Sequence, residues 1–446
     1  MPIISKEVVT VKNMLEMPLV IPDYQRPYKW LDSHVNQLFD DLLNHRYKNR
    51  YRLGTVVLHK EALEGSEQEL SIVDGQQRLL TLTLLCHMLD KNKLCQPNLL
   101  EQVFSSPITI ENLSHNAAVI DSRANQLSES DREYLVDFLL NRCELICVKL
   151  DDLSEAFQFF DSQNARGKPL EPYDLLKAFH LREMVDNTEL ERTQCVAIWE
   201  SKISPEPGSK ATSLHTIMSD SLFRLRSWTA GSSGRAFTRH HINAFKGVNL
   251  RSTPYRHTET LRALDYMVDQ YNADSVRHWD QQTMCYPFQI GQPLLNGKRF
   301  FEYIQHYIAT YENLFLHDKS ELKDLLKTIN NYSGRNRIGD HYVRTLFECA
   351  VLYYFDKFGD VELEKVAQRC FIWSYSIRLT KQRVALESID NEALEDNSLL
   401  KTIQKALHPH EVLAFIIPPL NKSELNAPKN VQGLVEKFTS LGYLQS

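Results

Sequence analysis

The spacing of apolar residues divides the chain into two parts of different character. In the first part, β-branched and alternating runs predict strands at residues 51–60, 69–74, 106–112 and 144–152. Segments of helical spacing lie between them, including one that opens near residue 76. After about residue 188, apolar residues recur at intervals of three and four almost throughout. The pattern predicts an α+β chain, with a mixed α/β domain and a small sheet over residues 1–187 and an α-helical domain over residues 188–446.

Composition adds limits to this picture. The chain has 446 residues, enough for two or three domains, and its 43% hydrophobic and 24% charged residues are typical of a globular protein. A net charge of −6 argues against a dedicated non-specific nucleic-acid binder, although a local basic groove is compatible with it. No apolar run reaches the roughly 18 residues of a membrane span, and no signal peptide is evident, so we expect a cytoplasmic protein. The eight cysteines are scattered, and we expect reduced, structural thiols.

The segment SIVDGQQR carries the first candidate chemistry. A strand that ends at Asp74 and a helix that starts near Gln76 leave Gly75 at the junction, next to a helix N-terminus that favours anions. Arg78 can hold a phosphate with two hydrogen bonds, and Gln76 and Gln77 can bond a phosphate, a base or a water. Asp74 can hold a divalent metal or orient water. The alternative is a tight turn in which Asp74 only caps the helix.

A second polar cluster lies in FFDSQNARGKPLEPYDLLKAF, between two predicted helices. Its candidate anion-binding residues are Asn164, Arg166, Gly167 and Lys168, followed in the next helix by Asp174 and Lys177. Two cations, an amide and a glycine suit an anion. The alternative is a helix–loop–helix connection in which Gly167 ends a helix and the charges are solvated.

A third candidate is the stretch YQRPYKW, residues 24–30, where three aromatic residues alternate with two cations. Tyr24 or Trp30 can stack on a base or sugar. The alternative, which the sequence leaves equally open, is an aromatic loop packed on the domain.

Other searches exclude several common sites. The chain has no P-loop, no GxGxxG, no HExxH and no GxSxG motif. The histidine pairs His240/His241 and His408/His410 stand outside any Cys/His ligand pattern. The acidic and basic residues of the segment 318–323 fit a solvated helix face better than a nuclease site.

The order YQRPYKW, LGTVVL, IVDGQQRLLTL and FFDSQNARGKPLEPYDLLKAF resembles the N-terminal domain family of the Gmr-type (GmrSD) modification-dependent restriction systems. This family, once labelled domain of unknown function 262, is distantly similar to ParB and sulfiredoxin folds. The resemblance covers about residues 8–185, and later helical segments also look like those of long family members. It implies nucleotide binding and hydrolysis without a P-loop, and a role in defence against phage or foreign DNA.

The resemblance carries over to individual positions. The residues that match the family motifs are Tyr24, Gln25, Arg26, Asp74, Gly75, Gln76, Gln77, Arg78, Asn164, Gly167, Asp174 and Lys177. Many family members also carry a C-terminal HNH nuclease domain, but HPHEVLAFIIPPLNKSELN has the wrong spacing for one. The chain therefore resembles the sensor and NTPase half alone, with a separate nuclease or effector subunit as its expected partner.

The main hypothesis is a nucleoside triphosphatase of an antiviral restriction system. Arg78 and Gln77 would bind phosphates, Asp74 would organise Mg²⁺ or water, and Lys168 or Lys177 would neutralise developing charge. Expected partners are a nucleoside triphosphate, DNA, a separate nuclease or effector subunit, and further copies of the chain. A second hypothesis is a module that recognises DNA or a nucleotide without hydrolysis. A third, a nuclease in its own right, is disfavoured by the missing HNH pattern.

Overall fold

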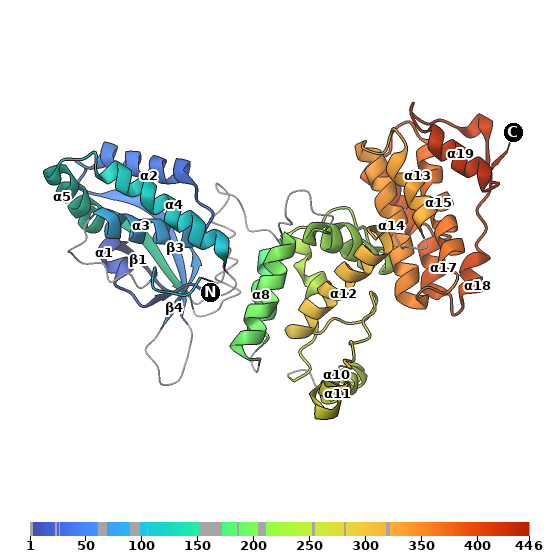
Figure 1. The fold of residues 1–446 in the computed structure, drawn as a ribbon, viewed down its shortest axis with the longest axis horizontal. Helices are drawn as coiled ribbons and strands as arrows, with labels where there is room; N and C mark the ends of the chain where they lie inside the picture. The colour runs from blue at the N-terminus through green and yellow to red at the C-terminus, as the bar shows by residue number, and fades with distance from the viewer. Residues whose placement is uncertain are drawn as a thin grey trace. The chain divides into compact units, whose positions relative to one another are not determined.

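The computed structural model divides the chain into two compact units, which are described separately (Figure 1). The first unit comprises residues 1–178 and 189–197, and the second comprises residues 179–188 and 198–446. The boundaries fall within helices α7 (Pro172–Arg182) and α8 (Glu189–Ile203). The structure describes residues 3–22, 25, 27–60, 69–89, 99–104, 106–150, 172–184, 187–203, 211–251, 255–280, 282–317 and 322–445.

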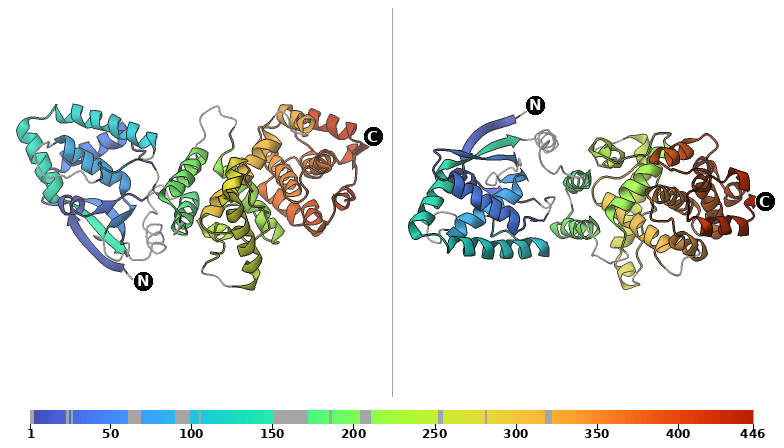
Figure 2. Two further views of the ribbon diagram at one scale, coloured as in Figure 1. Left: turned by 60° about the horizontal axis from the view of Figure 1, so that its bottom comes forward. Right: turned by 90° about the horizontal axis from the view of Figure 1, so that it is seen from above.

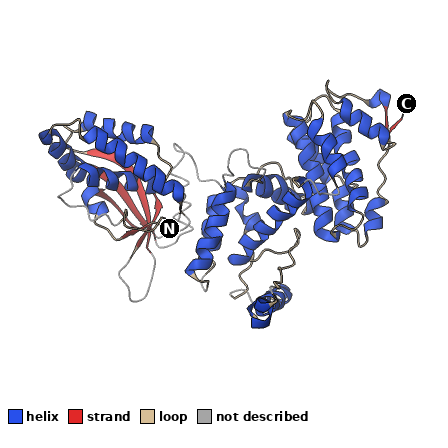
Figure 3. Cartoon of the chain, viewed as in Figure 1, coloured by secondary structure: helices blue, strands red, loops and turns tan. Residues whose placement is uncertain are grey.

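A mixed five-stranded sheet organises the first unit (Figure 3). Its strands are β1 (Ile3–Thr10), β2 (Leu19–Val20), β3 (Tyr51–Lys60), β4 (Leu70–Asp74) and β5 (Cys143–Leu150). Their order is β1-β5-β3-β4-β2, in which β5 and β3 are parallel and β3 and β4 are antiparallel. In both further views of Figure 2, this sheet lies in the blue-to-teal N-terminal part of the chain.

Alternation along the strands gives the sheet two apolar faces. Val56 and Leu58 of β3 belong to a large core shared with the helices, whereas Val57 packs with strand residues on the other face. The helices that contribute to the large core are α1 (Val11–Leu15), α2 (Asp32–His45), α3 (Gln76–Leu89), α4 (Pro107–Ala124), α5 (Glu129–Asp137) and η1 (Phe138–Arg142). Figure 1 shows α2, α3 and α4 together on one side of the sheet.

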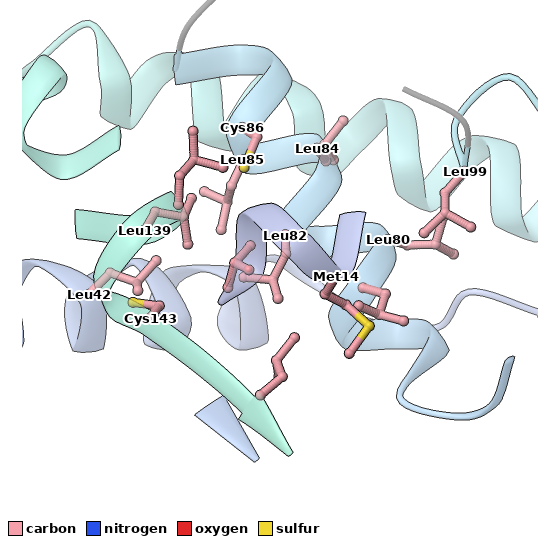
Figure 4. Packing of buried hydrophobic residues seen from close by; sticks show 14 of the residues in the cluster. Met14, Leu42, Leu80, Leu82, Leu84, Leu85, Cys86, Leu99, Leu139 and Cys143 are labelled. Carbon is pink, nitrogen blue, oxygen red and sulfur yellow. The ribbon is translucent and has the colours of Figure 1, made fainter. Parts of the chain in front are cut away.

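Helix α3 is the centre of this core (Figure 4). Its sequence LLTLTLL is apolar without a polar face, and every residue from Leu79 to Cys86 is buried. A helix that is apolar all round is stable only when other elements cover every side. The polar cluster that precedes it is therefore joined to a helix held rigidly in the domain centre.

The strand predicted at residues 106–112 is wrong. This segment begins α4, with Pro107 at the first helical position, which suits a residue that cannot donate a backbone hydrogen bond. Ile108 and Ile110, which suggested a strand, are about half exposed, while Thr109 and Leu113 are buried at helical spacing. Strands β1 and β2 were missed by sequence reasoning. The strands at 51–60, 69–74 and 144–152 are confirmed as β3, β4 and β5.

The second unit is mainly helical, as predicted. Its elements after α8 are η2 (Thr216–Phe223), α9 (Arg224–Thr229), η3 (Arg239–Phe245), η4 (Arg256–Thr258), α10 (Glu259–Ala273), α11 (Ser275–Trp279), α12 (Lys298–Phe315), α13 (Lys323–Asn331), α14 (Ile338–Phe358), α15 (Leu363–Thr380), α16 (Leu386–Leu394), α17 (Leu399–Lys405), α18 (Pro409–Leu413), β6 (Leu420–Asn421), η5 (Lys422–Glu424), α19 (Gln432–Ser440) and β7 (Leu444–Gln445). The short strands β6 and β7 pair in parallel.

One buried carboxylate holds the Gly/Ser-rich loop TAGSSGRAF, residues 229–237, in place. Asp390 of α16 accepts hydrogen bonds from Trp228 Nε1 at 2.9 Å, Ser233 Oγ at 2.7 Å and the Gly234 N–H at 2.8 Å. Burial alone would raise the pKa of Asp390, but these donors and Arg235 lower it. The small residues in the loop let its backbone reach this carboxylate.

Two further expectations concern the whole chain. The cysteines that the structure describes are all free, and only Cys285 is exposed; Cys95 lies outside the described residues. Within the described parts of the chain, no helix is both long and apolar enough to cross a membrane.

Buried His180 and half-buried Asp356, both in the second unit, have opposite effects on stability in acid. His180 of α7 is fully buried, with Nε2 3.0 Å from the Phe245 carbonyl and Nδ1 accepting from the Gly297 N–H at 3.2 Å. Burial lowers its pKa to about 3, so the ring is neutral. Asp356 of α14 accepts from Tyr307 Oη and the Ile290 N–H, and burial raises its pKa to about 6.

These shifts predict opposite pH dependences of stability. His180 binds a proton more readily in the unfolded chain, so its contribution is lost as pH falls below its ordinary pKa of about 6.5. Asp356 binds a proton more readily when folded, so its contribution is present in acid and lost as pH rises through about 6. On acidification, His180 lowers the unfolding free energy of the wild type by up to about 1.4 kcal/mol per pH unit, and Asp356 partly offsets this loss. His180→Gln should remove the loss. Asp356→Asn should remove the offset, so this variant should lose stability more steeply than wild type. Urea unfolding between about pH 4 and 7 measures both. Parallel pH profiles for the three proteins would contradict the prediction.

Candidate functional site

The start of α3 requires a glycine. Strand β4 ends at Asp74, Gly75 has φ +98°, and α3 begins at Gln76. A Cβ on Gly75 would lie 2.9 Å from Val56 Cγ2 and 3.5 Å from Val56 Cα. The glycine therefore provides a left-handed turn and also lets the start of α3 approach β3.

Gln77 ties this helix to the segment 27–30, part of the YQRPYKW loop. Its Oε1 accepts from the Lys29 N–H at 2.8 Å, and its Nε2 donates to the Pro27 carbonyl at 3.2 Å. Tyr28 lies between these two residues and is fully buried. Both ends of the Gln77 amide are thus engaged by backbone, which gives the side chain a positioning role.

Tyr28 packs as a core residue. Its hydroxyl lies 2.8 Å from Thr81 Oγ1 and accepts from Asn116 Nδ2 at 3.0 Å. Its backbone N–H donates to Thr109 Oγ1 at 3.0 Å, and its carbonyl accepts from Asn112 Nδ2 at 2.8 Å. Burial raises the pKa of Tyr28. For this aromatic residue, packing on the domain is the correct interpretation.

Gln25 completes the free edge of β4. Strand β2 pairs with β4 only at Leu70 and Ser71. Beyond that point, Gln25 Nε2 donates to the carbonyls of Ile72 and Val73 at 2.7 and 2.8 Å. A side-chain amide thus replaces a neighbouring strand and fixes the end of β4 just before Asp74.

The Arg78 side chain lies against Gly54 of β3, a second close approach that sequence reasoning missed. Its Nη1 donates to the Thr55 carbonyl at 3.2 Å, and a Cβ on Gly54 would lie only 3.0 Å from that nitrogen. Gly54 has φ +118° where the register of β3 against β5 shifts. A lone glycine inside the strand pattern LGTVVL is the sequence signal for such an approach. Burial lowers the pKa of Arg78, and Asp74 acts in the opposite direction by favouring its charge.

Gln76 differs from Gln77 and Gln25. It is only 6% exposed, and its Oε1 is buried with no hydrogen-bond partner among the residues that the structure describes. Buried polar atoms in native proteins nearly always have a partner, so an acceptor in this position suits a donor or cation that arrives with a ligand.

The structure brings Gln25, Gly75, Gln77 and Arg78 into one neighbourhood around the β4–α3 junction. Asp174 and Lys177 lie on α7 in the same compact unit, and Lys177 is fully buried. Six predicted site residues lie outside the described residues: Tyr24, Arg26, Asn164, Arg166, Gly167 and Lys168. Among the described residues, this junction included, no group of three His, Cys, Asp or Glu side chains could hold a metal.

Two protein-family models match different parts of the chain. Residues 191–432, more than half of the chain, match the model of a family of unknown function, DUF7834. The chain belongs to the DUF7834 family. In this DUF7834 protein, residues 7–181 match the GmrSD restriction endonuclease N-terminal domain, and no HNH domain is found. The match supports a role in a restriction system. No curated protein matches the chain.

The two reasons for Gly75 can be separated by experiment. Gly75→Ala meets both the positive φ and the contact with Val56, and we expect a loss of about 2–5 kcal/mol in unfolding free energy. Gly231→Ala is the matched control, because Gly231 has φ +75° but nothing within 4 Å of its Cβ position. It should cost only about 1 kcal/mol. Urea unfolding measures both, and equal losses would show that the close approach to Val56 is unimportant.

Proposed function

We propose that this protein binds a nucleoside triphosphate at the start of α3 and hydrolyses it as a component of a restriction system. The match to the GmrSD restriction endonuclease N-terminal domain over residues 7–181 supports the biological setting. The chemical part rests on Arg78, a largely desolvated guanidinium in the first turn of a rigidly packed helix.

The electrostatics of this junction favour a phosphate. The first N–H groups of an α-helix have no partner within the helix and carry partial positive charge. Arg78 adds a full charge whose pKa is lowered by burial, with Asp74 as its compensating neighbour. In a site of reduced dielectric, a phosphate near Arg78 gains more than it would in water.

The contacts distribute roles among the motif residues. Arg78 binds the phosphates, and the orphaned Gln76 Oε1 accepts from the ligand or contacts its metal. Gln77 and Gln25 hold the surrounding backbone, so we assign them positioning roles in place of the direct phosphate contact expected for Gln77. Trp30, which is partly buried and stacked on His34 at 5.9 Å, is the described candidate for contact with a base.

The residues present fit Mg²⁺ only if the phosphates of the nucleotide supply some of its ligands. Mg²⁺ is usually held by one or two carboxylates together with substrate phosphates and water. Asp74 supplies one carboxylate at the junction, and Gln76 Oε1 is a second oxygen without a partner in the described chain. Lys177, buried on α7 in the same unit, is the described candidate for neutralising charge on the phosphoryl group.

A second function is favoured by the engagement of Gln77. Because both ends of its amide bind loop backbone, Gln77 is not available to orient an attacking water. Without that contribution, the same site can recognise a nucleotide or DNA and leave it intact. DNA and a separate nuclease or effector subunit are the partners we propose in either case.

Phosphate release from ATP, GTP, CTP and UTP with Mg²⁺, measured with and without duplex DNA, separates these functions. Arg78→Ala should lower turnover by about 100-fold or more, the usual cost of removing a donor to transition-state charge. Arg50→Ala is the control, because Arg50 lies in the same unit with its side chain 79% exposed. Equal turnover in wild type and Arg78→Ala would contradict the assignment. Nucleotide binding without turnover in wild type would favour recognition alone.

A further inference from the structure

The segment HRYKNRYR, residues 45–52, joins α2 to β3 and is strongly basic. It holds four Lys or Arg residues, and no Asp or Glu occurs between Asp41 and Glu61. The chain as a whole has a net charge of −6. Cations that alternate with aromatic residues therefore form a local basic surface on an acidic protein, which is the footprint of a nucleic-acid contact.

Aromatic stacking holds this segment in place. The Tyr51 ring stacks on the His45 ring at 4.5 Å between centroids, and it lies 6.4 Å from the Phe138 ring of η1. The Lys48 ammonium lies 5.5 Å from the centre of the Tyr51 ring. The Lys48 N–H donates to the His45 carbonyl at 2.9 Å and closes the turn. The segment therefore presents its cations from a packed turn.

Two tyrosines lie exposed beside this turn. Tyr47 is 72% exposed and Tyr134 of α5 is 37% exposed, and their ring centroids are 5.8 Å apart. Arg46 lies over the Tyr47 ring at 4.9 Å and Arg142 over the Tyr134 ring at 4.6 Å, and each arginine donates to the hydroxyl of its tyrosine at 3.0 Å. Figure 1 shows α5 at one end of the first unit. An aromatic ring that is exposed and also fixed in this way offers a flat surface to another ring.

The carboxylates next to the two tyrosines are compensated by the same arginines. Asp131 lies 4.0 Å from Arg46 Nη2, and Asp137 lies 3.0 Å from Arg142 Nη2. The arginines that order the rings thus also offset these two negative charges.

The cations of the segment outnumber their acidic partners. Glu144 of β5 pairs with Arg50 at 3.0 Å, and Arg52 lies 3.9 Å from its other oxygen, so one carboxylate faces two guanidinium groups. Lys48 is exposed and makes no ion pair within the described part of the chain. Because Arg50 already neutralises Glu144, Lys48 and Arg52 are the cations left to attract a negatively charged ligand.

We propose that Tyr47, Lys48, Arg52 and Tyr134, here called the Tyr47 surface, bind single-stranded DNA. Lys48 and Arg52 contact backbone phosphates, and Tyr47 stacks on an unpaired base with Tyr134 beside it. A single strand fits an exposed aromatic ring better than a duplex, because the bases of a duplex already stack on one another. The choice of DNA rests on the restriction system proposed above, whereas the surface does not depend on nucleotide chemistry at Arg78.

Fluorescence anisotropy of a labelled thymidine oligonucleotide of about 16 nucleotides, long enough for a single-strand site, measures binding to the full chain without added nucleotide. Lys48→Gln/Arg52→Gln should lower the affinity by about tenfold or more. The slope of log affinity against log salt should become shallower by about 1.4, since each phosphate contact on a single strand contributes about 0.7. Arg50 is kept in this variant so that the buried Glu144 retains its partner.

The matched control is Lys327→Gln/Lys405→Gln, which removes two exposed cations of the second unit and changes the net charge equally. It should bind the oligonucleotide like wild type. An equal loss in the control, or wild-type binding by Lys48→Gln/Arg52→Gln, would overturn the proposal. Arg78→Ala should also bind like wild type. If the wild type hydrolyses no nucleotide but loses oligonucleotide binding in Lys48→Gln/Arg52→Gln, the function proposed at Arg78 fails and the Tyr47 surface stands.

The aromatic part of the surface has its own test. Tyr47→Ala should lower the affinity by about tenfold and leave the salt slope unchanged, whereas Tyr47→Phe, which keeps the ring, should bind like wild type. The oligonucleotide annealed to its complement should bind more weakly than the single strand. Wild-type binding by Tyr47→Ala, or tighter binding of the duplex, would overturn the assignment to a single strand. Competition by polyglutamate as effective as that by single-stranded DNA, counted per charge, would show a surface for an acidic protein and also overturn it.

Discussion

The geometry of the first unit depends on two side-chain amides that make the hydrogen bonds a neighbouring backbone would otherwise make. Gln77 donates and accepts on either side of Tyr28, and Gln25 takes the place of a strand beside the end of β4. A primary amide is suited to this because it carries both a donor and an acceptor on one short side chain. A carboxylate at Gln77 could not donate to the Pro27 carbonyl, and an ammonium there could not accept from the Lys29 N–H. A carboxylate at Gln25 would leave the carbonyls of Ile72 and Val73 without their donor. The position of Asp74 and Arg78 follows from this arrangement.

Two regions of the protein share one electrostatic design. At the start of α3, Arg78 is desolvated beside Asp74, and in η2 Arg224 is buried beside Asp220. Burying a charge is costly unless partners compensate it. In both places one buried polar atom also lacks a hydrogen-bond partner among the described residues: Gln76 Oε1 in the first and Arg224 Nε in the second. At the start of α3, the unpartnered Gln76 Oε1 is part of the physical basis for the proposed ligand site.

Local pattern explains what the sequence could predict. The strand before Asp74, the glycine at the junction and the helix after it are all set by neighbouring residues, and they were predicted correctly. The error at residues 106–112 arose because exposed Ile108 and Ile110 resemble a strand, while the helix depends on Pro107 and on burial at later positions. The role of Gln77 depends on a loop about fifty residues earlier, and the pairing of His215 with Asp220 depends on a π-helix. Neither produces a signal at helical or strand period.

A structure of the full chain with a non-hydrolysable nucleoside triphosphate and Mg²⁺ tests the central claim most directly. The account predicts that the phosphates lie at the N-terminus of α3, with oxygen atoms within hydrogen-bonding distance of the Arg78 guanidinium and with Gln76 Oε1 now partnered by the ligand or its metal. Gln77 should keep both bonds to the backbone of residues 27–29. A nucleotide bound elsewhere, or one whose phosphates point away from Arg78, would contradict the account.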